Sequence, residues 1–157
     1  LGIGPLLILI GLAVVIGLLT PDFLKPGNLS NIVSQTAVIA IVAIGQYLVI
    51  LTRGIDLSVG ANLALATVIG GLVFREIDSA PAVMLTMVLS GTAVGAVNGM
   101  AYVFGRLPHP FIITLATLSI CRGLALEFAI GHTTMRGMPD AIAAIGGAST
   151  FGLPNSV

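Results

Sequence analysis

The chain alternates between long apolar stretches and short polar connectors. A helix needs about 20 mostly apolar residues to cross a bilayer, because each backbone group must then bond within its own helix. Five stretches approach this length, the third being short, so we predict an all-α polytopic transmembrane helix bundle with about five spans. The predicted spans are residues 1–19, 32–51, 59–74, 81–104 and 111–130, followed by a Gly- and Ala-rich tail, 131–157, with a short helix near Ala141.

The connectors contain the residues that end one helix and start the next. Residues 21–31 include two prolines, a glycine and two asparagines, and we expect Ser30 or Asn31 to cap the second span. Pro81 stands where the fourth span begins, a position at which proline fits the first helical turn.

Composition agrees with a membrane protein and excludes several functions. Of the 157 residues, 57% are hydrophobic and 8% charged, whereas a soluble domain has about 25% charged residues. The net charge is zero without a basic run, so we expect no nucleic-acid partner. Cys121 is the single cysteine, and His109 and His132 lie in separate connectors, so no metal site is expected. Hydrolase, metalloprotease and phosphate-loop motifs are absent, so we expect no catalytic residue.

The two ends of the sequence suggest a piece of a longer protein. The chain starts at Leu1 in apolar sequence and finishes in a loop-like segment, so we expect residues 1–157 to be a fragment of one transmembrane domain. A signal peptide is an alternative for the first stretch, but the basic n-region and the cleavage site are missing, which favours a span. Positive charges do not decide the orientation: Arg53 and Arg106 are on one side, and Lys25, Arg75 and Arg136 on the other.

The connector after the second span is the strongest candidate for chemistry. Gly54 and Gly60 bracket Asp56 there, and an aspartate at the centre of a span costs about 2.5–3.5 kcal/mol on insertion scales. We expect a discontinuous helix in which Arg53 is the nearest partner of Asp56. Ser58 or Asn62 would hydrogen-bond the carboxylate or cap the third helix. The same spacing also fits an interfacial loop in which Asp56 or Ser58 only caps that helix.

Further polar and small residues are candidates for helix contacts. Gln35 and Gln46 are three turns apart and point the same way, so with Thr36 they form a polar face on the second span. Either interhelical hydrogen bonding or pathway lining explains this face. Gly91, Gly95 and Gly99 recur every four residues, which predicts a packing face on the fourth span.

Two charges lie within the fifth span. Arg122 and Glu127 are five residues apart and do not form a standard helical pair. We expect each to meet a partner on another helix, or Glu127 to reach the membrane interface.

Residues 46–60, Gln-Tyr-Leu-Val-Ile-Leu-Thr-Arg-Gly-Ile-Asp-Leu-Ser-Val-Gly, resemble the hallmark of one family, the permease subunits of ABC importers for ribose, xylose, arabinose and related sugars. Members usually read Val-Ile-Leu-Thr, a small residue, then Gly-Ile-Asp-Leu-Ser-Val-Gly. Further matches are Phe23-Leu24, Asn28-Leu29-Ser30-Asn31-Ile32, Gly95-Ala96-Val97-Asn98-Gly99, Gly105-Arg106-Leu107-Pro108, residues 111–117 and Arg122-Gly123. Arg53 departs from the usual small residue, and His109 from the more familiar Ala or Asn.

The resemblance implies about ten spans, of which this chain is roughly the N-terminal half, in the cytoplasmic (inner) membrane of a bacterium, with the N-terminus in the cytoplasm. The implied partners are a second permease subunit in a homo- or heterodimer, a cytoplasmic ATPase subunit that uses the ATP, an extracytoplasmic sugar-binding protein, and lipid. No cofactor is expected in this chain. Asp56, Ser58, Gln46 and Asn62 would border the translocation pathway or its gate, and Arg53, Gly54 and Gly60 would form the broken-helix motif.

Two other classes of function stay open at this point. An ion-coupled secondary transporter would bind H⁺ or Na⁺ at Asp56 in an unwound helix. A structural membrane subunit would use the glycine repeat and the glutamine face for packing alone. Uptake that survives loss of the ATPase but collapses with the ion gradient would favour the secondary transporter. Transport that stays intact with alanine at Asp56, but assembly that is abolished by added bulk at Gly95, would point to the structural subunit.

Overall fold

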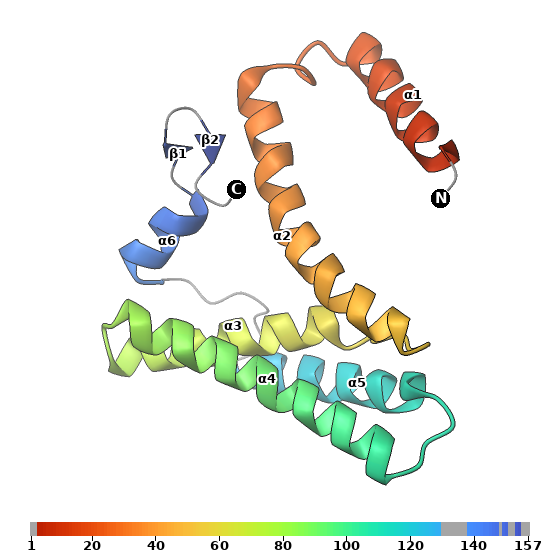
Figure 1. Cartoon of the computed structure of the whole chain (residues 1–157). Helices are drawn as coiled ribbons and strands as arrows, with labels where there is room; N and C mark the ends of the chain where they lie inside the picture. Colours follow the sequence, from red (N-terminus) through yellow and green to blue (C-terminus); the bar gives the residue numbers. More distant parts are fainter. Residues whose placement is uncertain (1–2, 130–137, 148, 151–152, 155–157) are drawn as a thin grey trace. The chain divides into compact units, whose positions relative to one another are not determined.

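The computed structural model describes residues 3–129, 138–147, 149–150 and 153–154 (Figure 1). Its elements are α1 (Gly4–Leu19), α2 (Pro26–Leu51), α3 (Val59–Glu76), α4 (Ala80–Phe104), α5 (Pro110–Phe128), α6 (Asp140–Gly147), β1 (Ser149–Thr150) and β2 (Leu153–Pro154). The chain divides into two compact units, residues 1–39 with 145–157, and residues 40–144.

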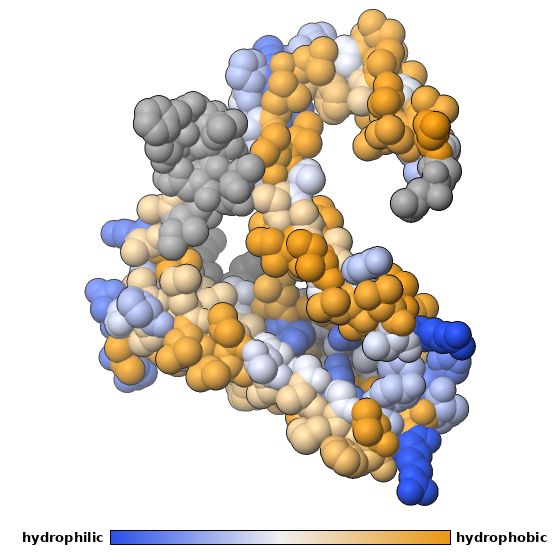
Figure 2. Space-filling model, viewed as in Figure 1, coloured by the Kyte–Doolittle hydropathy of each residue, from blue (hydrophilic) through white to orange (hydrophobic). Residues whose placement is uncertain are grey.

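The helices confirm the all-α polytopic class. α2, α3, α4 and α5 are long and apolar enough to cross a membrane, and α1 is a shorter apolar helix. With 16 residues, α1 is about 24 Å long at 1.5 Å per residue. Figure 2 shows apolar side chains over α1 and much of α2, as expected for helices that face lipid or other helices. The expected short helix near Ala141 is present as α6, and β1 and β2 form a two-residue antiparallel pair.

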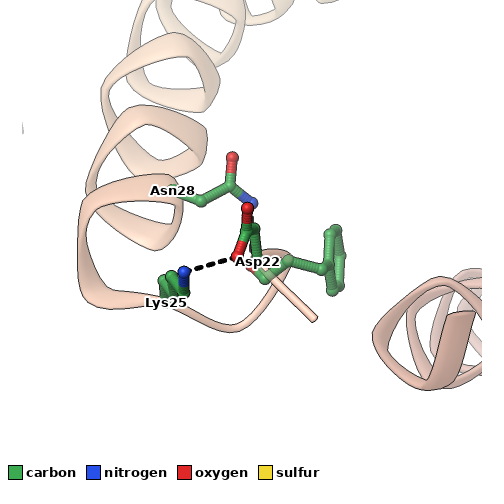
Figure 3. Close-up of polar contacts among 4 residues, drawn as sticks. Asp22, Lys25 and Asn28 are labelled. Atoms are coloured by element: carbon green, nitrogen blue, oxygen red, sulfur yellow. Dashed lines mark hydrogen bonds and ion pairs between the residues drawn. The ribbon is translucent and has the colours of Figure 1, made fainter. Parts of the chain in front are cut away.

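In the first unit, a tight turn joins α1 to α2. The backbone N–H of Phe23 donates to the Thr20 carbonyl at 3.0 Å, and Asn28 Nδ2 donates to the Phe23 carbonyl at 2.7 Å. Figure 3 shows Lys25 facing Asp22. Their Nζ and Oδ1 atoms are 2.5 Å apart and form an ion pair. The turn is therefore held by bonds between residues close in sequence.

α2 begins at Pro26, six residues before the predicted start. The predicted cap at Ser30 or Asn31 is therefore wrong, because both residues lie inside the helix. Proline has the backbone angle that the first helical turn requires, and the Leu29 N–H already bonds to the Lys25 carbonyl at 3.0 Å. The second proline thus starts the helix instead of prolonging the connector.

In the second unit, α3 packs against both α4 and α5 (Figure 1). Its buried residues are mostly small: Ala61, Leu65, Ala66, Val68, Gly70 and Gly71. Ala61, Leu65 and Val68 form a core with Cys121, Ala125 and Ala129 of the α5 region. A Cβ atom added at Gly70 would lie 2.5 Å from Met87 Cγ, so α3 and α4 approach closely at this glycine. Small residues at such contacts are typical of helices that pack within a membrane.

The glycine repeat of α4 does not make that contact. A Cβ atom at Gly91 would lie 4.0 Å from Asn62 Oδ1, and at Gly95 or Gly99 it would meet no described atom within 4 Å. The packing face formed by these glycines stays a prediction.

Candidate functional site

The site begins where α2 ends. Arg53 adopts the left-handed conformation, with φ of 60°. Its N–H bonds to the Ile50 carbonyl at 2.9 Å, and the Gly54 N–H bonds to the Val49 carbonyl at 3.0 Å. This pair of bonds is a Schellman motif, in which glycine is the usual left-handed residue. Arg53 therefore occupies a strained position that a residue without Cβ fills more easily.

α4 ends in the same way at Arg106, with φ of 49°. The Arg106 N–H bonds to the Val103 carbonyl at 3.3 Å, and the Leu107 N–H bonds to the Tyr102 carbonyl at 3.2 Å. Both arginines are exposed. Figure 2 shows hydrophilic surface where α4 ends and the connector to α5 begins.

Gly54 brings the connector against the start of α5. It is buried, and an added Cβ atom would lie 2.9 Å from Pro110 Cγ and 3.1 Å from Val49 Cγ1. A side chain here would separate the end of α2 from α5, so this glycine is required for packing. Gly60, the second residue of α3, is exposed and has no described neighbour within 4 Å of an added Cβ.

Asp56 is held by Ser58. Asp56 Oδ1 accepts hydrogen bonds from the Ser58 N–H at 2.7 Å and from the Ser58 hydroxyl at 2.6 Å. The predicted bond from Ser58 to the carboxylate is confirmed. Ser58 is also the N-cap residue of α3, although its side chain makes no capping bond. The connector therefore folds back on itself through an aspartate and a serine two residues apart.

The predicted pairing of Arg53 with Asp56 is wrong. Across the described residues, the one ion pair joins Lys25 to Asp22. The left-handed turn ends the helix with Arg53 exposed, whereas Asp56 is partly buried and bonded to Ser58. Oδ1 of the carboxylate is thus bonded to neutral donors and not to a cation.

Gln46 and Asn62 contact backbone carbonyls. Gln46 Nε2 donates to the Asp56 carbonyl at 2.8 Å, which ties α2 to the connector. Asn62 Nδ2 donates to the Gly91 carbonyl at 3.0 Å, so its predicted bond to the carboxylate is wrong. The side-chain oxygens Gln46 Oε1 and Asn62 Oδ1 are buried and have no partner among the described residues. Buried acceptors of this kind normally bond to water or to another group.

Asn98 and Thr117 extend the site into α4 and α5, which the sequence reasoning missed. Asn98 Nδ2 donates to Ser58 Oγ at 2.9 Å, and the Thr117 hydroxyl donates to Asn98 Oδ1 at 2.5 Å. All three side chains are buried. Thr114, also on α5, donates to the Ile55 carbonyl at 3.3 Å. The signal that could have found them is a polar side chain within an apolar span, which is costly unless it is paired.

A cavity of about 190 Å³ lies beside this network. Its lining comes from the end of α2, the connector, α4 and α5: Val49, Thr52, Asp56, Gly95, Asn98, Gly99, Tyr102, Pro110, Ile113 and Thr114. Two glycines of the repeat form part of the wall, where larger side chains would take up space. Carboxylate, amide and hydroxyl groups in an apolar wall can bind a small neutral solute by hydrogen bonds.

The remaining candidates do not join the site. Gln35 and Thr36 are exposed. Arg122 and Glu127 are also exposed and form no ion pair with any residue that the structure describes, so their partners stay a prediction. The described residues contain no group of three or more His, Cys, Asp or Glu that could hold a metal ion. His132 and Arg136 lie outside them.

Known relatives resemble this chain across the site. It is 40% identical over 131 residues to the ribose import permease protein of Bacillus subtilis (strain 168), covering 83% of this chain and 40% of the relative. The ribose import permease protein of Escherichia coli (strain K12) is 40% identical over 86% of this chain and 42% of the relative. The D-allose transport system permease protein of the same strain is 37% identical over 96% and 46%.

The chain thus spans less than half the length of these relatives. No solved structure matches it. Residues 28–153, which include every residue of the site described above, match the model of a family of transport permeases. The chain therefore belongs to the family described as branched-chain amino acid transport system / permease component.

Proposed function

We propose that this chain is part of the membrane permease of an ABC importer that carries a sugar or related polyol across the cytoplasmic membrane of a bacterium. The names of its ribose and D-allose relatives support the substrate class. The observation that carries the proposal is the environment of Asp56, a carboxylate that lines a cavity and is bonded to neutral donors instead of a cation. A neutral sugar needs such donors and acceptors and no ion-binding cage.

In this proposal, Asp56, Ser58, Gln46 and Asn62 border the translocation pathway or its gate. Asp56 accepts a hydrogen bond from a solute hydroxyl, and Ser58 holds the carboxylate. Gln46 holds the backbone of the connector through the Asp56 carbonyl. The buried oxygens of Gln46 and Asn62, which have no partner within the described part of the chain, would accept hydrogen bonds from water or solute, since leaving such a group unpaired costs about 1–3 kcal/mol.

The energy for transport comes from other subunits. The partners are a cytoplasmic ATPase subunit that uses ATP, a second permease subunit and an extracytoplasmic sugar-binding protein. This chain, with its N-terminus in the cytoplasm, binds no nucleotide. It contributes helix interfaces with two arrangements, and ATP binding and hydrolysis elsewhere shift the balance between them.

The ion-coupled alternative has weaker support. A site for Na⁺ would need several oxygen ligands around the ion, and among the described residues of the site Asp56 is the one carboxylate. The named relatives belong to import and transport systems for ribose and D-allose.

The test is uptake by the permease that contains this chain, expressed with its ATPase and binding protein in bacteria that lack their own pentose and allose uptake. Labelled D-ribose, D-allose, D-xylose and L-arabinose are supplied, with an inactive ATPase as control. Asp56→Asn is compared with Asp22→Asn, which changes an exposed aspartate of the first connector. Hydrogen bonds to charged groups contribute about 1.5–3 kcal/mol, so we expect Asp56→Asn to lower uptake at least about tenfold and Asp22→Asn to leave it unchanged. Uptake that ignores the ATPase and collapses with a proton or sodium gradient would overturn the proposal.

A further inference from the structure

Three hydrogen bonds link Thr117 to Asp56 in a chain, and in each of them the donor is the residue nearer Thr117. The Thr117 hydroxyl donates to Asn98 Oδ1, Asn98 Nδ2 donates to Ser58 Oγ, and the Ser58 hydroxyl donates to Asp56 Oδ1. The donor–acceptor distances are 2.5, 2.9 and 2.6 Å. The chain of bonds starts on α5, passes through α4 and ends in the connector, so residues 61 positions apart in sequence are joined by three bonds.

The direction follows from the number of hydrogens available. If the Asn98 amide were turned over, its oxygen would need the single hydroxyl hydrogen of Ser58. The 2.6 Å contact between Ser58 Oγ and Asp56 Oδ1 would then receive no hydrogen from Ser58. In the observed orientation, Asn98 Nδ2 supplies the hydrogen to Ser58 Oγ, so the Ser58 hydrogen is left for Asp56. The single Thr117 hydroxyl hydrogen is shared between Asn98 Oδ1 and the Ile113 carbonyl, 2.5 and 2.8 Å away. The Ser58 hydroxyl therefore donates to Asp56, because Ser58 Oγ accepts its other hydrogen bond from Asn98 Nδ2.

This arrangement leaves one oxygen of Asp56 free. Oδ1 accepts both bonds from Ser58, whereas Oδ2 has no hydrogen bond among the described residues and is not one of the buried, unpartnered oxygens. Asp56 also lines the 190 Å³ cavity. Hydrogen bonds in a chain polarise one another in a low-dielectric interior, so the three bonds together hold the carboxylate more firmly than one bond would.

We propose that Thr117 and Asn98 are positioning residues that hold Asp56, through Ser58, so that its Oδ2 accepts a hydrogen bond from one hydroxyl of the transported solute in the cavity. The inference rests on the proposed function and adds to it the accepting atom, Oδ2 of Asp56, and the two residues, Asn98 and Thr117, that hold it in place through Ser58. The solute class is a neutral polyol or sugar, and its recognition depends on a hydroxyl at one particular carbon.

The test is discrimination between a sugar and its deoxy derivatives. The purified importer is reconstituted in vesicles with saturating, loaded binding protein, and maximal uptake rates per assembled importer are measured for D-ribose and each of its monodeoxy derivatives. If D-allose is the better substrate in the uptake panel, it and its monodeoxy derivatives replace them. A site that bonds a hydroxyl rejects an analogue that lacks it, so we expect the wild type to prefer the parent sugar over one derivative by about tenfold or more.

Variants of Thr117 and Asn98 distinguish a role in positioning Asp56 from a role in folding or assembly alone. Thr117→Val removes the donor with little change of shape, and we expect the preference to fall by about threefold to tenfold, the effect of one hydrogen bond. Thr117→Ser keeps the hydroxyl and should retain the preference. The matched control is Thr92→Val, because Thr92 donates to the Val88 carbonyl of its own helix as Thr117 does to Ile113. Asn98→Ala combined with Thr117→Val should show the same preference as Asn98→Ala alone, since Thr117 acts through Asn98.

Two different failures are distinguishable. If the wild type shows no ATP-dependent uptake of any sugar, the proposed function fails and this inference fails with it. If uptake occurs but Thr117→Val keeps the full preference, the inference alone is overturned. It is also overturned if Thr117→Val lowers the rates for parent and deoxy sugars equally, because that result describes a role in assembly only.

Discussion

Two connectors of this chain each contain one acidic and one basic residue three positions apart, but only the first connector pairs them. The first places Asp22 three residues before Lys25, and the second places Arg53 three residues before Asp56. Asp22 and Lys25 form an ion pair at 2.5 Å, with side chains 73% and 66% exposed. Arg53 and Asp56 do not pair: the arginine lies in a left-handed helix end, and the carboxylate is bonded to Ser58. Spacing between opposite charges therefore does not identify a pair.

The two connectors also differ in the reach of their bonds. In the first, Asn28 bonds to a carbonyl five residues away. In the second, Asn98 bonds to Ser58 over 40 residues, and Thr114 bonds to Ile55 over 59. An exposed ion pair is worth little, whereas a buried polar network is costly when it is incomplete. Substitutions in the second connector should therefore have larger effects than equivalent ones in the first.

The largest difference should come from two glycines. Gly54→Ala places a Cβ atom 2.9 Å from Pro110 Cγ, and overpacking of this kind costs about 1–3 kcal/mol. Gly27→Ala, in the first turn of α2, meets no described atom within 4 Å and should stabilise the helix by up to about 1 kcal/mol. Unfolding of the purified permease, measured for both variants, should show opposite signs. Equal effects would mean that the connector does not pack against α5.

A smaller effect is expected at the left-handed arginines. Arg53→Gly relieves strain of about 1–2 kcal/mol and loses a favourable interaction with the helix dipole of about 0.3–1 kcal/mol, so a net stabilisation of about 1 kcal/mol is expected. Arg106→Gly is the matched control, because it ends α4 in the same conformation without an aspartate nearby in sequence. Thermal unfolding should show a similar rise in the melting temperature for both variants. If Arg53 neutralises Asp56, Arg53→Gly alone will destabilise the permease.

The smallest effect is expected at the exposed ion pair. Asp22→Asn removes the charge that faces Lys25, and exposed pairs contribute about 0.2–1 kcal/mol at most. We expect a loss of less than about 0.5 kcal/mol that disappears at high salt, because salt screens exposed charges. Unfolding at low and high ionic strength checks this. A larger, salt-independent loss would show that the first connector is buried in the assembled permease.

Part of the site could be predicted from the sequence. The connector around Asp56 was identified, as was the bond between Ser58 and the carboxylate, because a serine two residues after an aspartate can reach it through local geometry. The partners Asn98 and Thr117 were not predicted. They lie 40 and 59 residues after Ser58, and no local pattern specifies which helices meet there. The sequence predicts too late a start for α2, because two prolines in one connector suggest a longer turn than the structure has.

The sequence by itself determined the apolar helices, their approximate limits and the chemical type of the connector. These depend on hydropathy and on local backbone preferences, which act over a few residues. The tertiary structure alone decided which polar groups meet. Gly54 allows the connector to approach Pro110, α4 and α5 supply Asn98 and Thr117, and Asp56 is thereby bonded to neutral donors instead of to Arg53. Hydrogen bonds require distances near 3 Å and defined angles, and only the packing of helices distant in sequence sets those.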